Sequence, residues 1–221
     1  MRIAILFALF LLISCKTKTK QSVRFDFYPP LPDTSENKRR FLKEDAKENA
    51  FFNLTTLTQG VDSFEFRIRY VNSFDDSKDL LVFKCSKKQW QGFHYFSYPV
   101  SLKDFDGHDS TFINKKKFGD SVFLAKTIIP KCRWEKFSDS IRFYQISSLP
   151  TQSLIKNFKD HPVLDGGGVE IEIATKNSFR YLFYWTPDVY DYAECKKVIR
   201  FLEMLARQLG NDYLWPRQFL K

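Results

Sequence analysis

The alternation of apolar and charged residues between positions 64 and 70 restricts the fold of this chain more than any other feature. Residues 64–70 read FEFRIRY, with apolar side chains at the even positions and charged side chains at the odd positions. Successive side chains of a β-strand point to opposite faces, so this order places the two kinds of residue on different faces. It predicts an antiparallel strand with one face on a hydrophobic core and the other in water.

Further strands, separated by turn-forming residues, are predicted at residues 80–85, 90–98, 122–129, 169–173 and 179–185. Of these, residues 169–173, which read VEIEI, repeat the period of two. The first three strands of the chain would form a meander, and the last two would form a hairpin around Lys176-Asn177. The glycines Gly166–Gly168 would be a flexible loop into that hairpin, because a phosphate-binding glycine loop is followed directly by a helix.

Two helices are predicted from apolar residues spaced three and four apart. The first covers residues 134–144 and ends near Leu149-Pro150. The second starts at a capping box formed by Asp191 and Glu194 and stops at Gly210-Asn211. Its apolar stripe contains Cys195, Val198, Leu202, Leu205 and Leu209. Together these elements predict an α+β fold, in which an antiparallel meander and hairpin sheet of a single domain is packed by two main helices.

The beginning of the chain has the pattern of an export signal. Arg2 precedes an uninterrupted apolar run at residues 3–13. The basic residues that follow are Lys16, Lys18, Lys20 and Arg24. A helix needs about 20 apolar residues to span a bilayer, so the shorter run predicts a processed signal peptide.

The residues that end this run, Leu12-Ile13-Ser14-Cys15, resemble the lipobox of bacterial lipoproteins. The resemblance covers only the first fifteen to twenty residues. It implies that residues 1–14 are a lipoprotein signal peptide and that Cys15 carries a diacylglycerol and an N-acyl chain such as palmitate, which together anchor a protein stably. Lys16 stands where many such proteins carry an aspartate for inner-membrane retention, so the resemblance implies delivery to the outer membrane, facing the periplasm. An ordinary secretory signal with a chance cysteine is the alternative.

Residues 15–34 are predicted to be the lipidated cysteine and a tether. The stretch YPPLP at residues 28–32 favours an extended, semi-rigid chain. The folded domain would then cover residues 35–221. Residues 33–48 are mostly charged, so we expect a helix there that faces solvent.

The charge of the mature chain permits anionic partners. Removing residues 1–14 takes away only Arg2, so 34 basic and 26 acidic residues remain, a balance of 34 − 26 = +8. Lys84, Lys87 and Lys88 stand close to Trp90 in the sequence, and cations beside aromatic rings can bind a glycan or anionic lipid. The alternative is that strand alternation takes some of these aromatic rings into the core. No nucleic acid is expected as the partner of an exported protein.

A candidate metal site lies in the polar stretch DFDGHDS at residues 104–110. Its possible ligands are Asp104, Asp106, His108 and Asp109. Carboxylate oxygens are the ligands that hard cations prefer, but the spacing does not fit an EF-hand loop. An exposed acidic turn without metal is the alternative, and we assign no cofactor.

Three thiols remain after the lipidated one. Three is an odd number, so at most one internal disulfide can form, and the oxidising periplasm favours one between Cys85 and Cys132. Cys195 lies on the stripe of the last helix and is predicted to be a small buried hydrophobe. His94 falls within a predicted strand, where a structural histidine is the usual finding.

No complete catalytic motif is present, neither a nucleophile elbow, nor a phosphate loop, nor a paired-cysteine zinc motif. Glu170 and Glu172 share a strand face at a spacing that glycoside cleavage could use, but alternating acids are ordinary on a solvated strand face. The leading hypothesis is a membrane-anchored envelope lipoprotein with a non-enzymatic binding or accessory role toward an envelope protein or glycan. The alternatives are an envelope enzyme acting on glycan or lipid through groups in residues 104–108 or His161, and an inhibitor or immunity-type protein.

Overall fold

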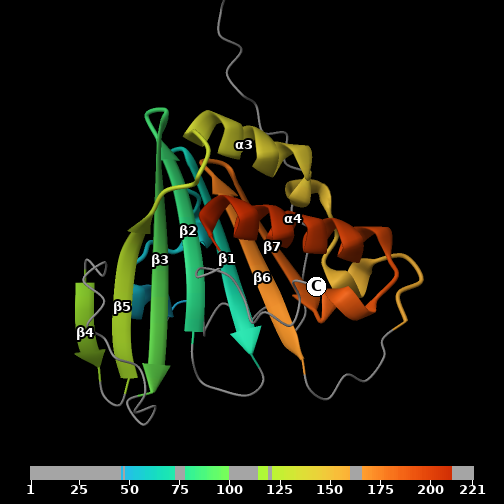
Figure 1. Ribbon diagram of the computed structural model, residues 1–221, viewed down its shortest axis with the longest axis horizontal. Coiled ribbons are helices and arrows are strands. Elements are labelled where there is room, and N and C mark those ends of the chain that lie inside the picture. The colour runs from blue at the N-terminus through green and yellow to red at the C-terminus, as the bar shows by residue number, and fades with distance from the viewer. Residues whose placement is uncertain are drawn as a thin grey trace, which may run out of the picture.

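Seven strands form one antiparallel sheet in the computed structural model of the chain, which describes residues 46, 48–72, 78–99, 114–118, 121–159 and 166–210 (Figure 1). The strands are β1 (Phe64–Asn72), β2 (Lys78–Ser86), β3 (Gln89–Pro99), β4 (Asn114–Phe118), β5 (Ser121–Ile128), β6 (Gly167–Thr175) and β7 (Ser178–Trp185). Their order across the sheet is β4-β5-β3-β2-β1-β6-β7. A strand is present at each of the six places where the sequence predicts one.

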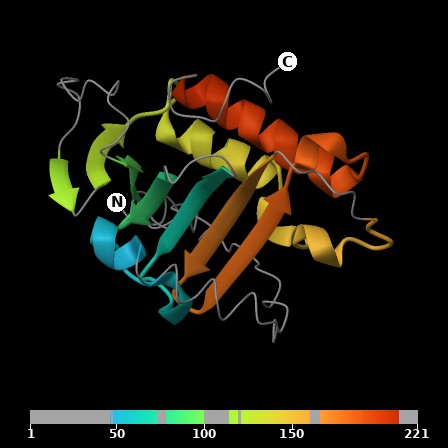
Figure 2. The ribbon, with the colours of Figure 1, turned by 90° about the horizontal axis from the view of Figure 1, so that it is seen from below.

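Two α-helices, α3 (Trp134–Phe143) and α4 (Ala193–Leu209), lie on one face of this sheet (Figures 1 and 2). The short 3₁₀ helices are η1 (Leu57–Gln59), η2 (Ile146–Ser148), η3 (Gln152–Leu154) and η4 (Pro187–Val189). An antiparallel sheet packed by two main helices is the α+β fold that the sequence predicts, and the prediction is confirmed.

The face of the sheet under α3 and α4 carries the main hydrophobic core. Phe66 of β1 meets Phe201 of α4 with ring centroids 5.7 Å apart, and Phe83 of β2 meets Phe137 of α3 at 5.1 Å. None of these four side chains is more than 1% exposed. Burial of such rings is the main free energy that holds the helices on the sheet, at about 25 cal/mol per Å² of apolar surface.

The stripe expected on the last helix faces this core. All five of its residues, Cys195, Val198, Leu202, Leu205 and Leu209, are buried. Gly210, with φ of 94°, follows the last helical residue as predicted. The start of the helix differs, because Tyr192 occupies the cap position and no side chain caps the helix. Asp191 is therefore not a capping residue; it pairs with Lys196, and the hydrogen bond from that ammonium lowers the pKa of Asp191.

A second layer covers the opposite face of the sheet (Figure 2). It consists of residues 48–52, which are helical, and the segment that leads from them through η1 into β1. Phe52 packs against Leu80 of β2, and Leu57 of η1 is only 1% exposed. Both faces of β1, an interior strand of the sheet, are therefore covered.

Two segments depart from the sequence prediction. Residues 114–118 read NKKKF and form strand β4, although they have no apolar alternation that would indicate a strand. Gly167 and Gly168 lie inside β6, and not in a flexible loop. A Cβ atom on Gly167 would collide with the Tyr70 ring, and one on Gly168 would lie 2.9 Å from the Phe183 ring. The glycines are needed in the strand because aromatic rings cover its backbone.

Candidate functional site

Charged side chains gather between the sheet and residues 48–57, on the face away from α3 and α4. We call them the charge cluster. Its members are Glu48, Glu65, Arg67, Arg69, Glu170 and Glu172, with Lys78 and Lys84 at its rim. The register of β1 and β6 places Arg67 opposite Glu172 and Arg69 opposite Glu170. Cross-strand neighbours of opposite charge attract each other, so the sheet itself brings these groups together.

Arg67 is 1% exposed and uses its whole guanidinium group. Nε donates to Glu65 at 2.7 Å, Nη1 donates to Oδ1 of Asn49 at 2.6 Å, and Nη2 donates to the backbone carbonyl of Thr55 at 2.6 Å. A carboxylate oxygen of Glu172 lies 3.8 Å from Nη1. Two of these partners, Asn49 and Thr55, belong to the segment before β1, so Arg67 fastens that segment to the sheet.

Arg69 makes the second link between the same two layers. Its Nη1 donates to Glu170 at 2.6 Å, and its Nε lies 3.0 Å from Glu48. Glu172 is 3.9 Å from Nη1. Burial alone would lower the pKa of Arg69, but the carboxylates of Glu48, Glu172 and Glu170 outweigh it and raise the pKa above its ordinary value. Arg69 is therefore held firmly in its charged form.

Lysines at the rim complete the charge balance. Lys84 lies 3.4 Å from Glu65, and Lys78 lies 3.8 Å from Glu48. The four carboxylates of the cluster thus face two guanidinium groups and two ammonium groups, so its formal charge is zero. Buried ions are tolerated in proteins when opposite charges face them in this way.

The sequence predicts that Glu170 and Glu172 lie on a solvated face of their strand, and the structure contradicts this prediction. Glu172 is 1% exposed, and both carboxylates reach the same guanidinium group of Arg69. The other oxygen of Glu170 accepts a hydrogen bond from the Tyr181 hydroxyl at 3.1 Å, and burial together with that carboxylate raises the pKa of Tyr181. This arrangement stabilises the fold; it does not leave two carboxylates facing an open site for acid and base catalysis.

A related prediction is also wrong: the charged face of β1 is buried, with Glu65 at 4% and Arg69 at 6% exposure. Of the solvent-facing helix expected over residues 33–48, only residues 46 and 48 lie in the described part of the chain. Ala46 is exposed as expected, but Glu48 is 6% exposed. The reason is the same in each case: residues 48–57 lie over the charged face, and period-two alternation does not reveal what covers that face.

The sequence did not reveal Glu48, Asn49 and Thr55 as partners of Arg67 and Arg69. The ion pairs within the sheet could have been found, because two strands carry arginines and glutamates on one face: FEFRIRY in β1 and VEIEI at residues 169–173. Pairing these strands side by side would have predicted cross-strand ion pairs. Nothing in the local sequence predicts the contribution of residues 48–57.

The structure divides the residues predicted to form a ligand surface. Cys85 pairs with Trp90 and Lys84 pairs with Gln91 in the β2–β3 register, so Lys84 and Trp90 lie on opposite faces of the sheet. The Trp90 ring stacks on Trp134 of α3, with centroids 6.1 Å apart. The turn residues of this hairpin, at positions 87 and 88, are exposed.

His94 and the thiols have structural surroundings. Nε2 of His94 lies 2.6 Å from Oδ1 of Asp79, and the histidine is 6% exposed, which fits the structural role expected of it. Cys195 is fully buried, as predicted. Cys85 and Cys132 are free thiols, so the predicted disulfide is absent; both are half-buried and pack against the main core, where burial raises the pKa of Cys85.

Several predicted residues lie outside the described part of the chain. They are Cys15, Asp104, Asp106, His108, Asp109 and His161. Within the described ranges, no group of three or more histidine, cysteine, aspartate or glutamate residues is arranged to hold a metal ion.

Comparisons with protein-family models, with curated proteins and with solved structures find no significant match for this chain. Among the described residues, no helix is both long enough and apolar enough to cross a membrane.

Proposed function

We propose that this chain is a lipid-anchored lipoprotein of a bacterial envelope, whose α+β domain has a non-enzymatic binding or accessory role toward an envelope partner. The observation that carries the proposal is the sequence Leu12-Ile13-Ser14-Cys15 directly after the apolar run at residues 3–13. Acylation of Cys15 would hold the chain on the membrane, because several buried acyl chains make a stable anchor. The residues after Cys15 would hold the domain in the periplasm, on the outer membrane.

The way the described chain enters the fold supports an N-terminal anchor. Residues 48–57 are fixed to the sheet by hydrogen bonds from Arg67 to Asn49 and Thr55 and by the ion pair of Arg69 with Glu48. Charge-assisted hydrogen bonds of this kind are short and directional. A force applied through the tether would therefore act on a segment that the interior strand β1 holds in place.

A binding role is supported by the use of the buried carboxylates. Glu48, Glu65 and Glu172 each lie within 4 Å of a guanidinium group. A general acid or base must instead be aimed at a reacting group. The acids most deeply placed in the described residues thus contribute to the fold.

The anchor is tested by metabolic labelling with an alkyne analogue of palmitate. Wild type should take up label and change in mass when the lipoprotein signal peptidase is inhibited. Cys15→Ser should take up no label, and Cys85→Ser is the matched control that should label normally. Equal labelling of wild type and Cys15→Ser would overturn the proposal.

The accessory role is tested by gentle solubilisation of the envelope followed by affinity purification through a C-terminal tag. We expect one envelope protein or glycan to copurify with the chain in near-equal amount. A solitary chain that turns over envelope glycan or lipid would contradict a non-enzymatic role.

A further inference from the structure

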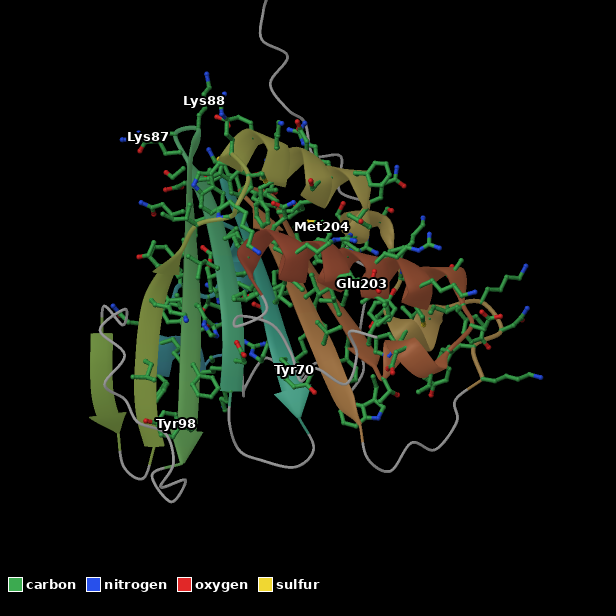
Figure 3. All side chains as sticks on the ribbon, viewed as in Figure 1. Tyr70, Lys87, Lys88, Tyr98, Glu203 and Met204 are labelled. Carbon is green, nitrogen blue, oxygen red and sulfur yellow. The ribbon has the colours of Figure 1, made fainter. Side chains whose placement is uncertain are left out.

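The tip of the β2–β3 hairpin has an unfavourable sequence for its backbone. Lys87 and Lys88 form its two-residue turn with φ of 49° and 67°, which is left-handed geometry at both positions. Such turns favour Asn-Gly, because a side chain with a full Cβ substituent is strained there. Figure 3 shows both lysines at the end of the hairpin, directed away from the sheet. Strain kept in an exposed turn points to a use for those side chains.

The start of α3 lies beside this turn and carries the same sign of charge. Trp134, the first residue of α3, stacks on Trp90, which follows the turn by two residues. Arg133 occupies the cap position without a side-chain cap hydrogen bond. The N-terminus of a helix carries partial positive charge, so a cation at this position is unfavourable for the helix. Arg133 is exposed, as are its basic neighbours at positions 131 and 136.

The loop between β5 and α3 adds an apolar side chain to this end of the molecule. Ile129 is 74% exposed, directly after the last residue of β5. The register places Ile128 beside Gly92, at the same end of the sheet as the hairpin tip. A strained turn, a poorly capped helix and an exposed isoleucine thus occur together, and local rules are usually broken where function requires it.

The cations at this end outnumber the acids. Phe64 pairs with Cys85 and with Thr175, so the β6–β7 turn with Lys176 lies at the same end of the sheet as the β2–β3 turn. We call these cations the basic end: Lys87, Lys88, Lys131, Arg133, Lys136 and Lys176, all exposed. The nearby acids by position are Asp62 and Glu135. Within the described ranges, none of the six basic side chains forms an ion pair, whereas the arginines of the charge cluster are fully paired.

We propose that the basic end binds the phosphate headgroups of an anionic membrane surface, with Ile129 entering the interface between headgroups and acyl chains. Lysines and arginines near an anionic membrane are attracted to it. An apolar side chain among them adds contact that only a membrane provides. The proposal gains from the proposed anchor, which would keep the domain near a membrane, but it does not require that anchor.

Vesicle binding of the mature chain from residue 15, with Cys15→Ser so that no acyl chain contributes, tests the proposal. We expect about tenfold tighter binding to phosphatidylcholine vesicles with about 30% phosphatidylglycerol than to pure phosphatidylcholine, and weaker binding as salt rises. Lys131→Glu/Arg133→Glu should reduce binding to the anionic vesicles about tenfold. Equal binding to both vesicle types would overturn the proposal.

The variant Lys87→Asn/Lys88→Gly separates binding from folding. It installs the pair that this turn favours, so the melting temperature should rise while vesicle binding falls. Lys197→Glu/Arg200→Glu, on an exposed part of α4, is the control for total charge and should keep binding within about twofold of wild type. If this control loses as much binding as the Lys131 and Arg133 variant, attraction to overall charge explains the result and the proposal fails.

Ile129→Ser distinguishes a membrane from a soluble polyanion. We expect weaker binding to anionic vesicles and unchanged binding to polyphosphate in solution. Unchanged vesicle binding, with polyphosphate bound as tightly as vesicles, would assign the basic end to a soluble polyanion and overturn the membrane proposal. Equal palmitate labelling of wild type and Cys15→Ser would reject the anchor and leave these vesicle results intact.

Discussion

The two faces of β1 are both buried, but they are buried by different chemistry. Phe66 points toward α4 into an apolar core, and the next residue, Arg67, points to the opposite side into paired charges. Each is 1% exposed. Apolar contacts are not directional, so the core can accept another apolar side chain of similar shape. The buried guanidinium group of Arg67, in contrast, needs each of its hydrogen-bond and ion-pair partners in position. One strand therefore shows how a sheet can be enclosed by a core on one side and by an ion network on the other.

The largest loss of stability is expected on the charged face of β1, from the variant Arg67→Met. It removes a buried guanidinium group, so that Glu65 keeps only Lys84 at the rim and Glu172 keeps only Arg69 as a cationic partner. We expect the free energy of unfolding to fall by about 3–5 kcal/mol, measured by urea denaturation. Adding Glu65→Leu should recover part of the loss, because a buried carboxylate that has lost its guanidinium partner is then removed. A loss below about 1 kcal/mol for Arg67→Met would show that the network is not formed in solution.

A smaller loss of stability is expected when the ion pair between Glu48 and Arg69, which links the second layer to the sheet, loses its negative charge. Glu48→Gln keeps the shape of the side chain but removes the charge that faces Arg69 at 3.0 Å. The free energy of unfolding should fall by about 1.5–3 kcal/mol, and amide hydrogen exchange should quicken first in residues 48–57. Glu203→Gln on α4 (Figure 3) is the matched control and should cost less than about 0.5 kcal/mol. Equal exchange in the two variants would refute the fastening role of Glu48.

On the apolar face of β1, a change in the shape of Phe66 should lower the free energy of unfolding less than the loss of Arg67 does. Phe66→Leu keeps an apolar side chain of reduced size under α4, and the surrounding rings can partly close over it. We expect a loss of about 1–2 kcal/mol in the same urea experiment. A loss as large as that of Arg67→Met would contradict the idea that the core face is the more tolerant of the two.

The contrast also explains which parts of the structure the sequence could predict. The core face of β1 and the stripe of α4 follow from spacing, because a period of two or of three and four identifies the element and its apolar side. Cys195 was placed correctly for that reason. Strand β4 was missed because NKKKF has no such period, and its place at the sheet edge depends on pairing with β5.

The charged face was predicted incorrectly for a different physical reason. A row of charges in a strand indicates water only when nothing else supplies the opposite charges. Here Glu170 and Glu172 come from a strand about a hundred positions further along the chain, and Glu48 comes from before β1. Such long-range complementarity decides burial and is not visible in any local window of residues.

The smallest effect concerns Cys195, which reports on the apolar face alone. Burial, together with the charge of Glu194, raises the pKa of its thiol to about 11 from 9.0. A raised folded-state pKa contributes stability that is complete below pH 9 and is lost as pH rises through about 11, so Cys195→Ala should show a slightly flatter alkaline stability profile. Alkylation of the folded protein at pH 8 should modify Cys132 and Cys85 before Cys195, as read by mass spectrometry.

The same alkylation experiment tests whether the two faces of the sheet are independent. Glu48→Gln should leave the protection of Cys195 unchanged, because the thiol lies on the other side of the sheet from the charge cluster. Phe66→Leu, on the same face as the thiol, should make Cys195 easier to alkylate. If Glu48→Gln had the same effect, the two faces of the sheet would open as one unit, and the view that they are stabilised independently would be wrong.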